Sequence, residues 1–174
     1  MYYAKLDLVA VILSIAALSA PAASASPPAR SLTEYRFLIG SWTCRVTENG
    51  KPDAQSKVTF EWLYDGNVLK ETVNSATYAG QFMTVLDMSS GMFKGVAVGN
   101  DGSYIVWETA GLTDNKSTEV GYLFGNGKMT AVSRSDFEKV SETHYIIRDF
   151  RADTSTGKGP PTDTEDCLKD ASGK

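Results

Sequence analysis

Few side chains in this chain have the chemistry of a catalytic group. His144 is the single histidine, so no serine–histidine–aspartate triad can be assigned, and zinc ligands do not occur as a cluster. Carboxylates are plentiful, but their spacing selects no acid–base pair, and the default interpretation is charge on a solvated outer face. Those on expected strands are Glu61, Glu71, Asp87 and Glu108. The sequence therefore favours a non-enzymatic protein.

Aromatic side chains are the stronger candidates for binding. They are spread over many short β-type segments, where they could fill a core or line the wall of a ligand cavity. Both interpretations stay open, because the size of the fold decides between them. The candidate ligand-binding residues are Trp62, Phe82, Tyr104, Trp107, Tyr122 and Tyr145.

The two cysteines, Cys44 and Cys167, are interpreted together with the N-terminus. Residues 1–25 have the pattern of a secretory signal peptide: Lys5, an apolar run over residues 8–18, and small residues before the expected cleavage. In an exported protein two cysteines tend to pair. We therefore expect a periplasmic or secreted protein with a Cys44–Cys167 disulfide.

After a linker at residues 26–30, a single domain is expected over residues 31–170. Ser31 and Glu34 have the spacing of a capping box for a short helix that ends before Gly40. Alternating segments separated by turn residues then follow, and long helical patterns are absent. The expected strands are 41–47, 57–62, 68–74, 81–88, 92–98, 104–109, 117–124, 128–134, 142–151 and 162–168. This pattern predicts an all-β, antiparallel up-and-down barrel of about 8–10 strands.

The cysteines also indicate how the barrel closes. In a closed meander the first and last strands are neighbours, and Cys44 and Cys167 lie in these two strands. The short helix with Leu38 is expected to plug one end of the barrel. Gly40 ends the helix, and Trp42 is expected to lie across that end from inside.

The segment 37–42, Phe-Leu-Ile-Gly-Ser-Trp, resembles the entry to strand one in calycins, the group of lipocalins, fatty-acid-binding proteins and haem-binding nitrobindins. It is most similar to secreted bacterial calycin-like proteins, which share the Leu-x-Gly-x-Trp entry and a run like 101–108. The resemblance implies a small apolar ligand inside the barrel. A nitrobindin-like alternative would use His144 as a ligand to haem iron. Otherwise no cofactor is expected.

The formal net charge of −4, with both signs spread along the chain, argues against a nucleic-acid surface. No membrane association is expected once the signal peptide is removed. Segments 82–86 and 104–107 are apolar on both faces, which predicts a cover on the outside of the barrel. The N-terminal helix or a second copy of the protein could provide it. A protein-binding, inhibitor-like module is the other alternative function.

Overall fold

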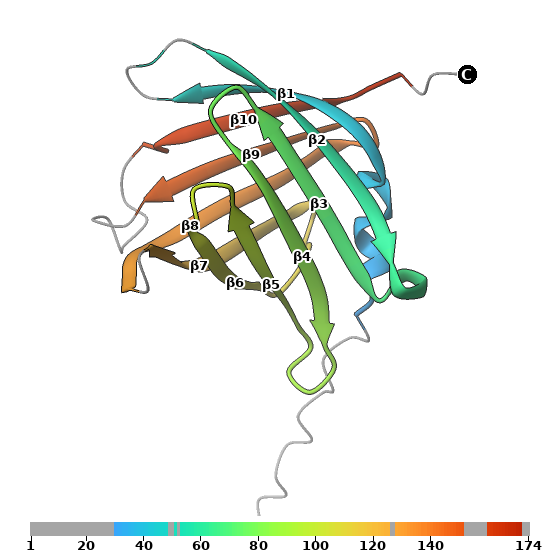
Figure 1. Cartoon of the computed structure of the whole chain (residues 1–174). Helices are drawn as coiled ribbons and strands as arrows, with labels where there is room; N and C mark the ends of the chain where they lie inside the picture. The colour runs from blue at the N-terminus through green and yellow to red at the C-terminus, as the bar shows by residue number, and fades with distance from the viewer. Residues whose placement is uncertain (1–29, 49–50, 52, 126–127, 152–159, 172–174) are drawn as a thin grey trace, which may run out of the picture.

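The computed structural model describes residues 30–48, 51, 53–125, 128–151 and 160–171. Within them, ten antiparallel strands form a closed barrel in which each strand pairs with its sequence neighbours and β1 pairs with β10 (Figure 1). The expected signal peptide and most of the linker lie outside the described residues. The strands are β1 (Gly40–Glu48), β2 (Ala54–Leu63), β3 (Val68–Ser75), β4 (Ala79–Asp87), β5 (Met92–Gly99), β6 (Tyr104–Thr109), β7 (Lys116–Gly125), β8 (Lys128–Ser141), β9 (His144–Arg151) and β10 (Asp163–Lys169).

The predicted fold class is confirmed, and the strands lie close to the predicted segments. The main difference is β8, which continues to Ser141 although a strand was expected only to Arg134. The second half of β8 is rich in Ser, Asp, Glu and Lys, so its alternation of apolar and polar residues is weak. Pairing with β7 on one side and β9 on the other holds this half in the sheet despite its composition.

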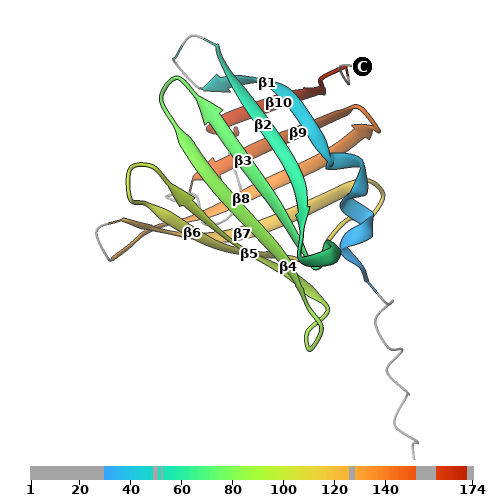
Figure 2. The same cartoon turned by 45° about the vertical axis from the view of Figure 1, so that its right-hand side comes forward.

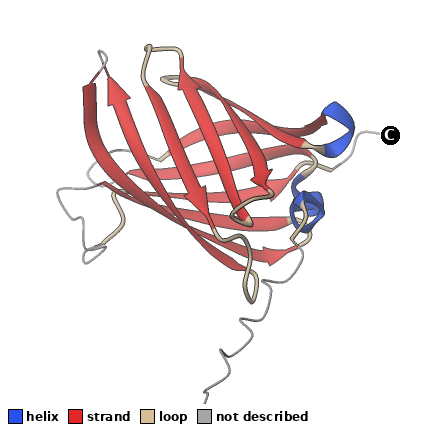
Figure 3. Cartoon of the chain, turned by 90° about the horizontal axis from the view of Figure 1, so that it is seen from below, coloured by secondary structure: helices blue, strands red, loops and turns tan. Residues whose placement is uncertain are grey.

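A 3-10 helix, η1 (Leu32–Leu38), leads into the barrel at one end (Figure 2). The Ser31 hydroxyl accepts a hydrogen bond from the Thr33 backbone N–H, as expected of an N-cap. Glu34 does not close the expected capping box; its carboxylate accepts from the Leu112 backbone N–H at 3.0 Å. Glu34 therefore ties the helix to the loop between β6 and β7. A second helical turn, η2 (Tyr64–Gly66), lies at the same end of the barrel (Figure 3).

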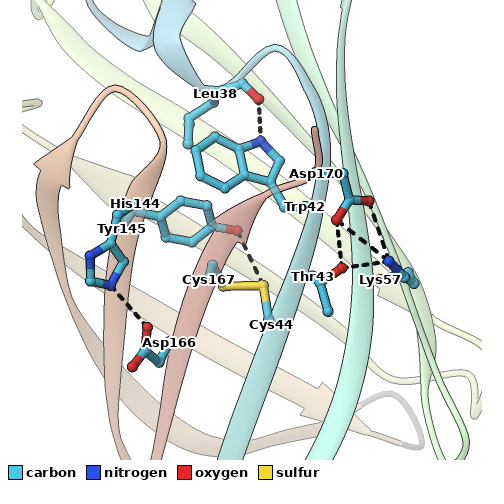
Figure 4. The surroundings of a disulfide bond; sticks show 10 residues. All are labelled: Leu38, Trp42, Thr43, Cys44, Lys57, His144, Tyr145, Asp166, Cys167 and Asp170. Carbon is cyan, nitrogen blue, oxygen red and sulfur yellow. Dashed lines mark hydrogen bonds and ion pairs between the residues drawn. A yellow bond between two sulfur atoms is a disulfide. The ribbon is translucent and has the colours of Figure 1, made fainter. Parts of the chain in front are cut away.

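The buried side of η1 closes this end of the barrel. Leu38 is buried, and its carbonyl accepts a hydrogen bond of 2.6 Å from the indole nitrogen of Trp42, which is fully buried (Figure 4). The Trp42 ring meets Tyr145 edge-on, with 4.8 Å between the ring centroids. Gly40 begins β1 with a φ of 120°, a backbone conformation that favours glycine. The plug and the first strand are thus joined by a glycine and one buried hydrogen bond.

The seam between β1 and β10 carries the predicted disulfide. Cys44 and Cys167 face each other in the register of the two strands and are bonded through their sulfur atoms (Figure 4). Both are fully buried, and the Tyr145 hydroxyl lies 3.6 Å from the Cys44 sulfur. The bond links strands whose cysteines are 123 positions apart in the sequence.

The outer face of β4–β7 carries an apolar surface. Met83, Val96, Val106 and Tyr122 are cross-strand neighbours in that order and are each 39–45% exposed. The apolar side chains of η1 are instead buried in the barrel core, so this helix does not cover the outer face. Of the two expected covers, the second copy of the protein stays a prediction. No helix among the described residues has the length and hydropathy required to cross a bilayer.

Candidate functional site

The barrel interior contains a partly open cavity of about 190 Å³, which is lined at the plugged end by Tyr35 and Leu38 of η1. Its wall combines aromatic and aliphatic side chains with polar ones from most of the strands. Compared with an engineered cavity of roughly 150 Å³ that holds benzene, this space fits a molecule built on a single ring. The aromatic residues that line it are Tyr35, Phe60, Tyr78, Phe82, Trp107 and Phe137.

Four carboxyl groups line the same cavity: Glu71 of β3, Glu119 of β7, Asp149 of β9 and Glu165 of β10. They share the inward face because strand residues alternate between the two sides of a sheet. Glu165 lies two positions before the buried Cys167. Glu71 sits between Leu69 and Val73, which also line the cavity.

Burial shifts the pKa of each of these carboxyl groups upward. Desolvation raises the pKa of Glu119 to about 7. Desolvation, with Asp163 adding repulsion, raises that of Glu165 to about 7. Glu71 has its pKa raised well above the ordinary value by desolvation and then by repulsion from Glu165, Glu119 and Asp149. Glu71 is thus the group whose charge the other three carboxylates disfavour.

Asp149 differs from the other three carboxyl groups in having a hydroxyl partner. The Ser135 hydroxyl donates a hydrogen bond to its carboxylate. Burial and the adjacent Asp163 nevertheless raise the pKa of Asp149 well above its usual range. Among the groups whose positions the structure describes, none donates a hydrogen bond to the side chains of Glu71, Glu119 or Glu165.

Among the lysine and arginine residues whose side chains the structure describes, none lines this cavity. The ion pairs of the barrel lie elsewhere; for example, Lys70 meets Glu61 and Lys94 meets Asp87, each at 2.8 Å. The side chains that the structure describes at the lumen thus include four carboxyl groups and no lysine or arginine.

Two further polar groups at the cavity wall lack partners. The Tyr35 side chain is only 6% exposed, and its hydroxyl makes no hydrogen bond of normal geometry. The Ser117 hydroxyl approaches closely enough to lower the pKa of Tyr35, but desolvation and nearby Glu119 outweigh this effect and raise it. The indole N–H of Trp107 is also buried without a hydrogen-bond partner. Buried donors and acceptors are normally satisfied, so these two point to a missing partner in the lumen.

The predicted ligand-binding aromatics occupy three different environments. Phe82 and Trp107 line the cavity. Trp62 packs against the core, and Tyr145 is fully buried beside the disulfide as part of the plug. Tyr104 and Tyr122 lie on the outer face, where they are 39% and 45% exposed. The structure therefore brings only two of the six into the cavity wall.

Strand geometry explains why Tyr104 and Tyr122 lie on the outer face and not in the cavity wall. Tyr104 and Trp107 are three residues apart on β6, so their side chains must point to opposite faces. Tyr122 is opposite Val106 in the register and shares the outer face with it. Strand alternation alone would have excluded one of Tyr104 and Trp107.

His144 is not among the residues that line the cavity. It precedes the inward-facing Tyr145, and its Nε2 lies 2.9 Å from a carboxylate oxygen of Asp166 (Figure 4). Asp166 also meets Arg45 at 3.4 Å in an exposed ion pair. This position gives no support to the haem-ligand role, which stays a prediction drawn from the resemblance.

Sequence reasoning assigned Glu71 to the solvated outer face and did not single out Glu119, Asp149 or Glu165. The alternation of strand side chains could have identified two of these inward-facing carboxyl groups. Glu165 has the same parity as Cys167, and Asp149 the same parity as Tyr145 and Ile147. Once the disulfide is placed inside the barrel, those two carboxyl groups must also face inward.

No protein-family model and no curated protein matches this chain. Among solved structures, the chain is similar to a redesigned β barrel, mFAP1, bound to DFHBI, with 12% sequence identity and a TM-score of 0.40. The match covers 82% of this chain and all of the other. A likeness this low carries no argument about the site, and the calycin family stays a resemblance.

Proposed function

We propose that this protein binds a small molecule inside its barrel. The observation that carries the proposal is the cavity of about 190 Å³, whose wall combines aromatic rings with a few convergent polar groups. Ligand sites have this composition, whereas a barrel interior that only stabilises the fold is filled by apolar side chains. The small volume limits the ligand to about the size of one ring with a short substituent.

We also propose that the protein is exported to the periplasm or secreted. The support is the buried Cys44–Cys167 disulfide, because such bonds persist in oxidising compartments and are rare in the cytosol. The signal-peptide pattern at residues 1–25 agrees with this proposal. A binding protein of this kind would meet its ligand in the periplasm or outside the cell.

The sequence predicted an apolar ligand, whereas the cavity wall suggests a ligand with both polar and apolar parts. Four carboxyl groups share the wall with the aromatic rings. A purely apolar molecule would leave the buried Tyr35 hydroxyl and Trp107 indole N–H without partners. It would also displace solvent from the carboxyl groups without replacing its hydrogen bonds, which is unfavourable. The proposed ligand is therefore amphipathic.

The proposal is tested by filling the cavity. Ser133 lines the lumen, and Ser133→Phe places a ring inside it; Thr118→Phe, on the exposed face of neighbouring β7, is the matched control. Native mass spectrometry of protein purified from an oxidising compartment should show a copurified small molecule in the wild type and in Thr118→Phe. Single-ring compounds should raise the melting temperature of the wild type and of Thr118→Phe.

Ser133→Phe should lose both signals while retaining the near-ultraviolet circular dichroism of a folded barrel. A wild type that carries no molecule and responds to no single-ring compound contradicts the proposal. Equal binding by a folded Ser133→Phe variant would also contradict it, because the ligand would then lie outside the lumen.

A further inference from the structure

We infer that the lumen is a site for a small organic cation, an amine carried on a single aromatic ring. This inference rests on the proposed function and specifies the chemistry of its ligand. The carboxyl groups of Glu71 and Glu119 receive the ammonium group, and the aromatic wall receives the ring.

The charge of the wall is the first part of the argument. Glu71, Glu119, Asp149 and Glu165 face the lumen, and no described lysine or arginine side chain lines it. Glu165, Glu119 and Asp149 each repel the ionised form of Glu71. An ammonium group in their midst would favour the ionised carboxylates and offset their desolvation. A neutral ligand offers no such compensation.

The unpartnered polar groups provide an independent observation. The Tyr35 hydroxyl lies near Glu119, is buried at the wall and makes no hydrogen bond of normal geometry. The Trp107 indole nitrogen is likewise buried without an acceptor. An ammonium group can donate to the tyrosine oxygen, and a ligand oxygen can accept from the indole. These groups extend the expected ligand to an amine that also carries a hydroxyl.

The spacing of the carboxyl groups separates an organic cation from a metal ion. A divalent metal requires several ligand atoms close together. Among the described residues, the group of three or more potential ligand atoms within 4.8 Å of one another is Glu165 with Cys44 and Cys167. The sulfur atoms of these cysteines are joined in the disulfide and are not thiolate ligands. The acidic wall is thus spread around a space that a larger organic cation can occupy.

The aromatic wall fits the remainder of such a molecule. Phe60 and Phe82 flank Glu71 in the strand register, one from β2 and one from β4. A cation beside aromatic rings is further stabilised when the site is desolvated. Gly95 leaves room for the Trp107 indole, since a Cβ on this glycine would lie 2.3 Å from the ring. The ligand therefore meets rings and carboxyl groups from neighbouring positions.

The experiment uses three probes with one skeleton and different charges: tyramine, its neutral alcohol analogue tyrosol, and the anion 4-hydroxyphenylacetate. Binding to the oxidised mature protein is measured by isothermal titration calorimetry at pH 8. We expect tyramine to bind at least tenfold more tightly than tyrosol, and the anion to bind most weakly. Glu71→Gln and Glu119→Gln should each reduce tyramine affinity about tenfold or more and leave tyrosol affinity within threefold.

Glu108→Gln on the exposed face of β6 is the matched control and should bind all three probes like the wild type. Having two lumen variants keeps the test valid if one of them fails to fold, as judged by near-ultraviolet circular dichroism. Equal affinity for tyramine and tyrosol, or tightest binding of the anion, would overturn the cation inference while leaving small-molecule binding intact. Failure of all three probes, with no copurified molecule, would overturn both. A calcium titration that stabilises the wild type and displaces tyramine would overturn the organic cation in favour of a metal.

Discussion

Replacing Glu119 by glutamine should stabilise the barrel at alkaline pH. Burial raises the pKa of Glu119 from 4.5 to about 7. In the window between these values the folded state holds a proton that the unfolded state has released, so stability falls as pH rises from about 4.5 to about 7. Above about pH 7 the loss of stability from Glu119 is complete. Below about pH 4.5 there is no loss, because Glu119 is protonated in both the folded and the unfolded state.

The size of the effect follows from the pKa of Glu119. Each pH unit between 4.5 and about 7 lowers the free energy of unfolding by about 1.4 kcal/mol. The full loss from Glu119 is therefore about 3 kcal/mol. The partial solvent exposure of Glu119 reduces this loss, and the expected gain for Glu119→Gln at pH 8 is ~1–3 kcal/mol. The substitution should also stabilise the protein through Glu71, because it removes one of the negative charges that raise the pKa of Glu71. At pH 5 glutamine and the protonated glutamic acid are nearly equivalent, and the variants should differ by less than about 1 kcal/mol.

Urea unfolding of the oxidised, ligand-free protein at pH 5, 6, 7 and 8 measures this difference directly. The wild type should lose stability over the series, and Glu119→Gln should lose less. Glu108→Gln, on the outer face, controls for the change in net charge and should follow the wild type. If Glu119→Gln has the same dependence on pH as the wild type, Glu119 is solvated, and the account of an acidic, desolvated lumen is refuted.

Three further variants test the architecture. The double variant Cys44→Ser, Cys167→Ser should lose about 5 kcal/mol in denaturant unfolding, from the loop-closure entropy of 123 positions; a loss below about 1 kcal/mol would show that the seam is held by the strands alone. Trp42→Phe removes the 2.6 Å hydrogen bond to the end of η1 and should cost ~1–3 kcal/mol by urea unfolding, and no loss would argue against the plug. Gly95→Val should destabilise by about 1–3 kcal/mol and change the emission of Trp107, whose ring occupies the space of the added side chain; an unchanged spectrum would contradict this packing.

The strands and their closure could be predicted from local pattern. Alternation in segments such as 57–62, together with turn residues between the segments, identifies strands, because strand side chains alternate with a period of two. Cys44 and Cys167 then predict the neighbours at the seam, since a disulfide needs close Cα positions. Ser31 and Gly40 marked the two ends of the helical entry through cap and backbone chemistry.

Weakly alternating segments were harder to predict. The second half of β8 alternates only weakly between apolar and polar residues, so neither its extent nor its orientation follows from its own residues. Two neighbouring strands decide both. Tyr122 looked like a binding residue by type, but the register opposite Val106 puts it on the outer face. Residue type alone does not distinguish a lumen aromatic from an exposed one.

The sequence by itself determined that this chain is a disulfide-bonded meander of strands with a plugged end. It did not reveal the acidic lumen. Glu71, Glu119, Asp149 and Glu165 lie far apart in the sequence and belong to four strands, of which only β9 and β10 are paired. The physical reason is that alternation is a local property, whereas the groups that face one another across a lumen depend on how the whole barrel closes.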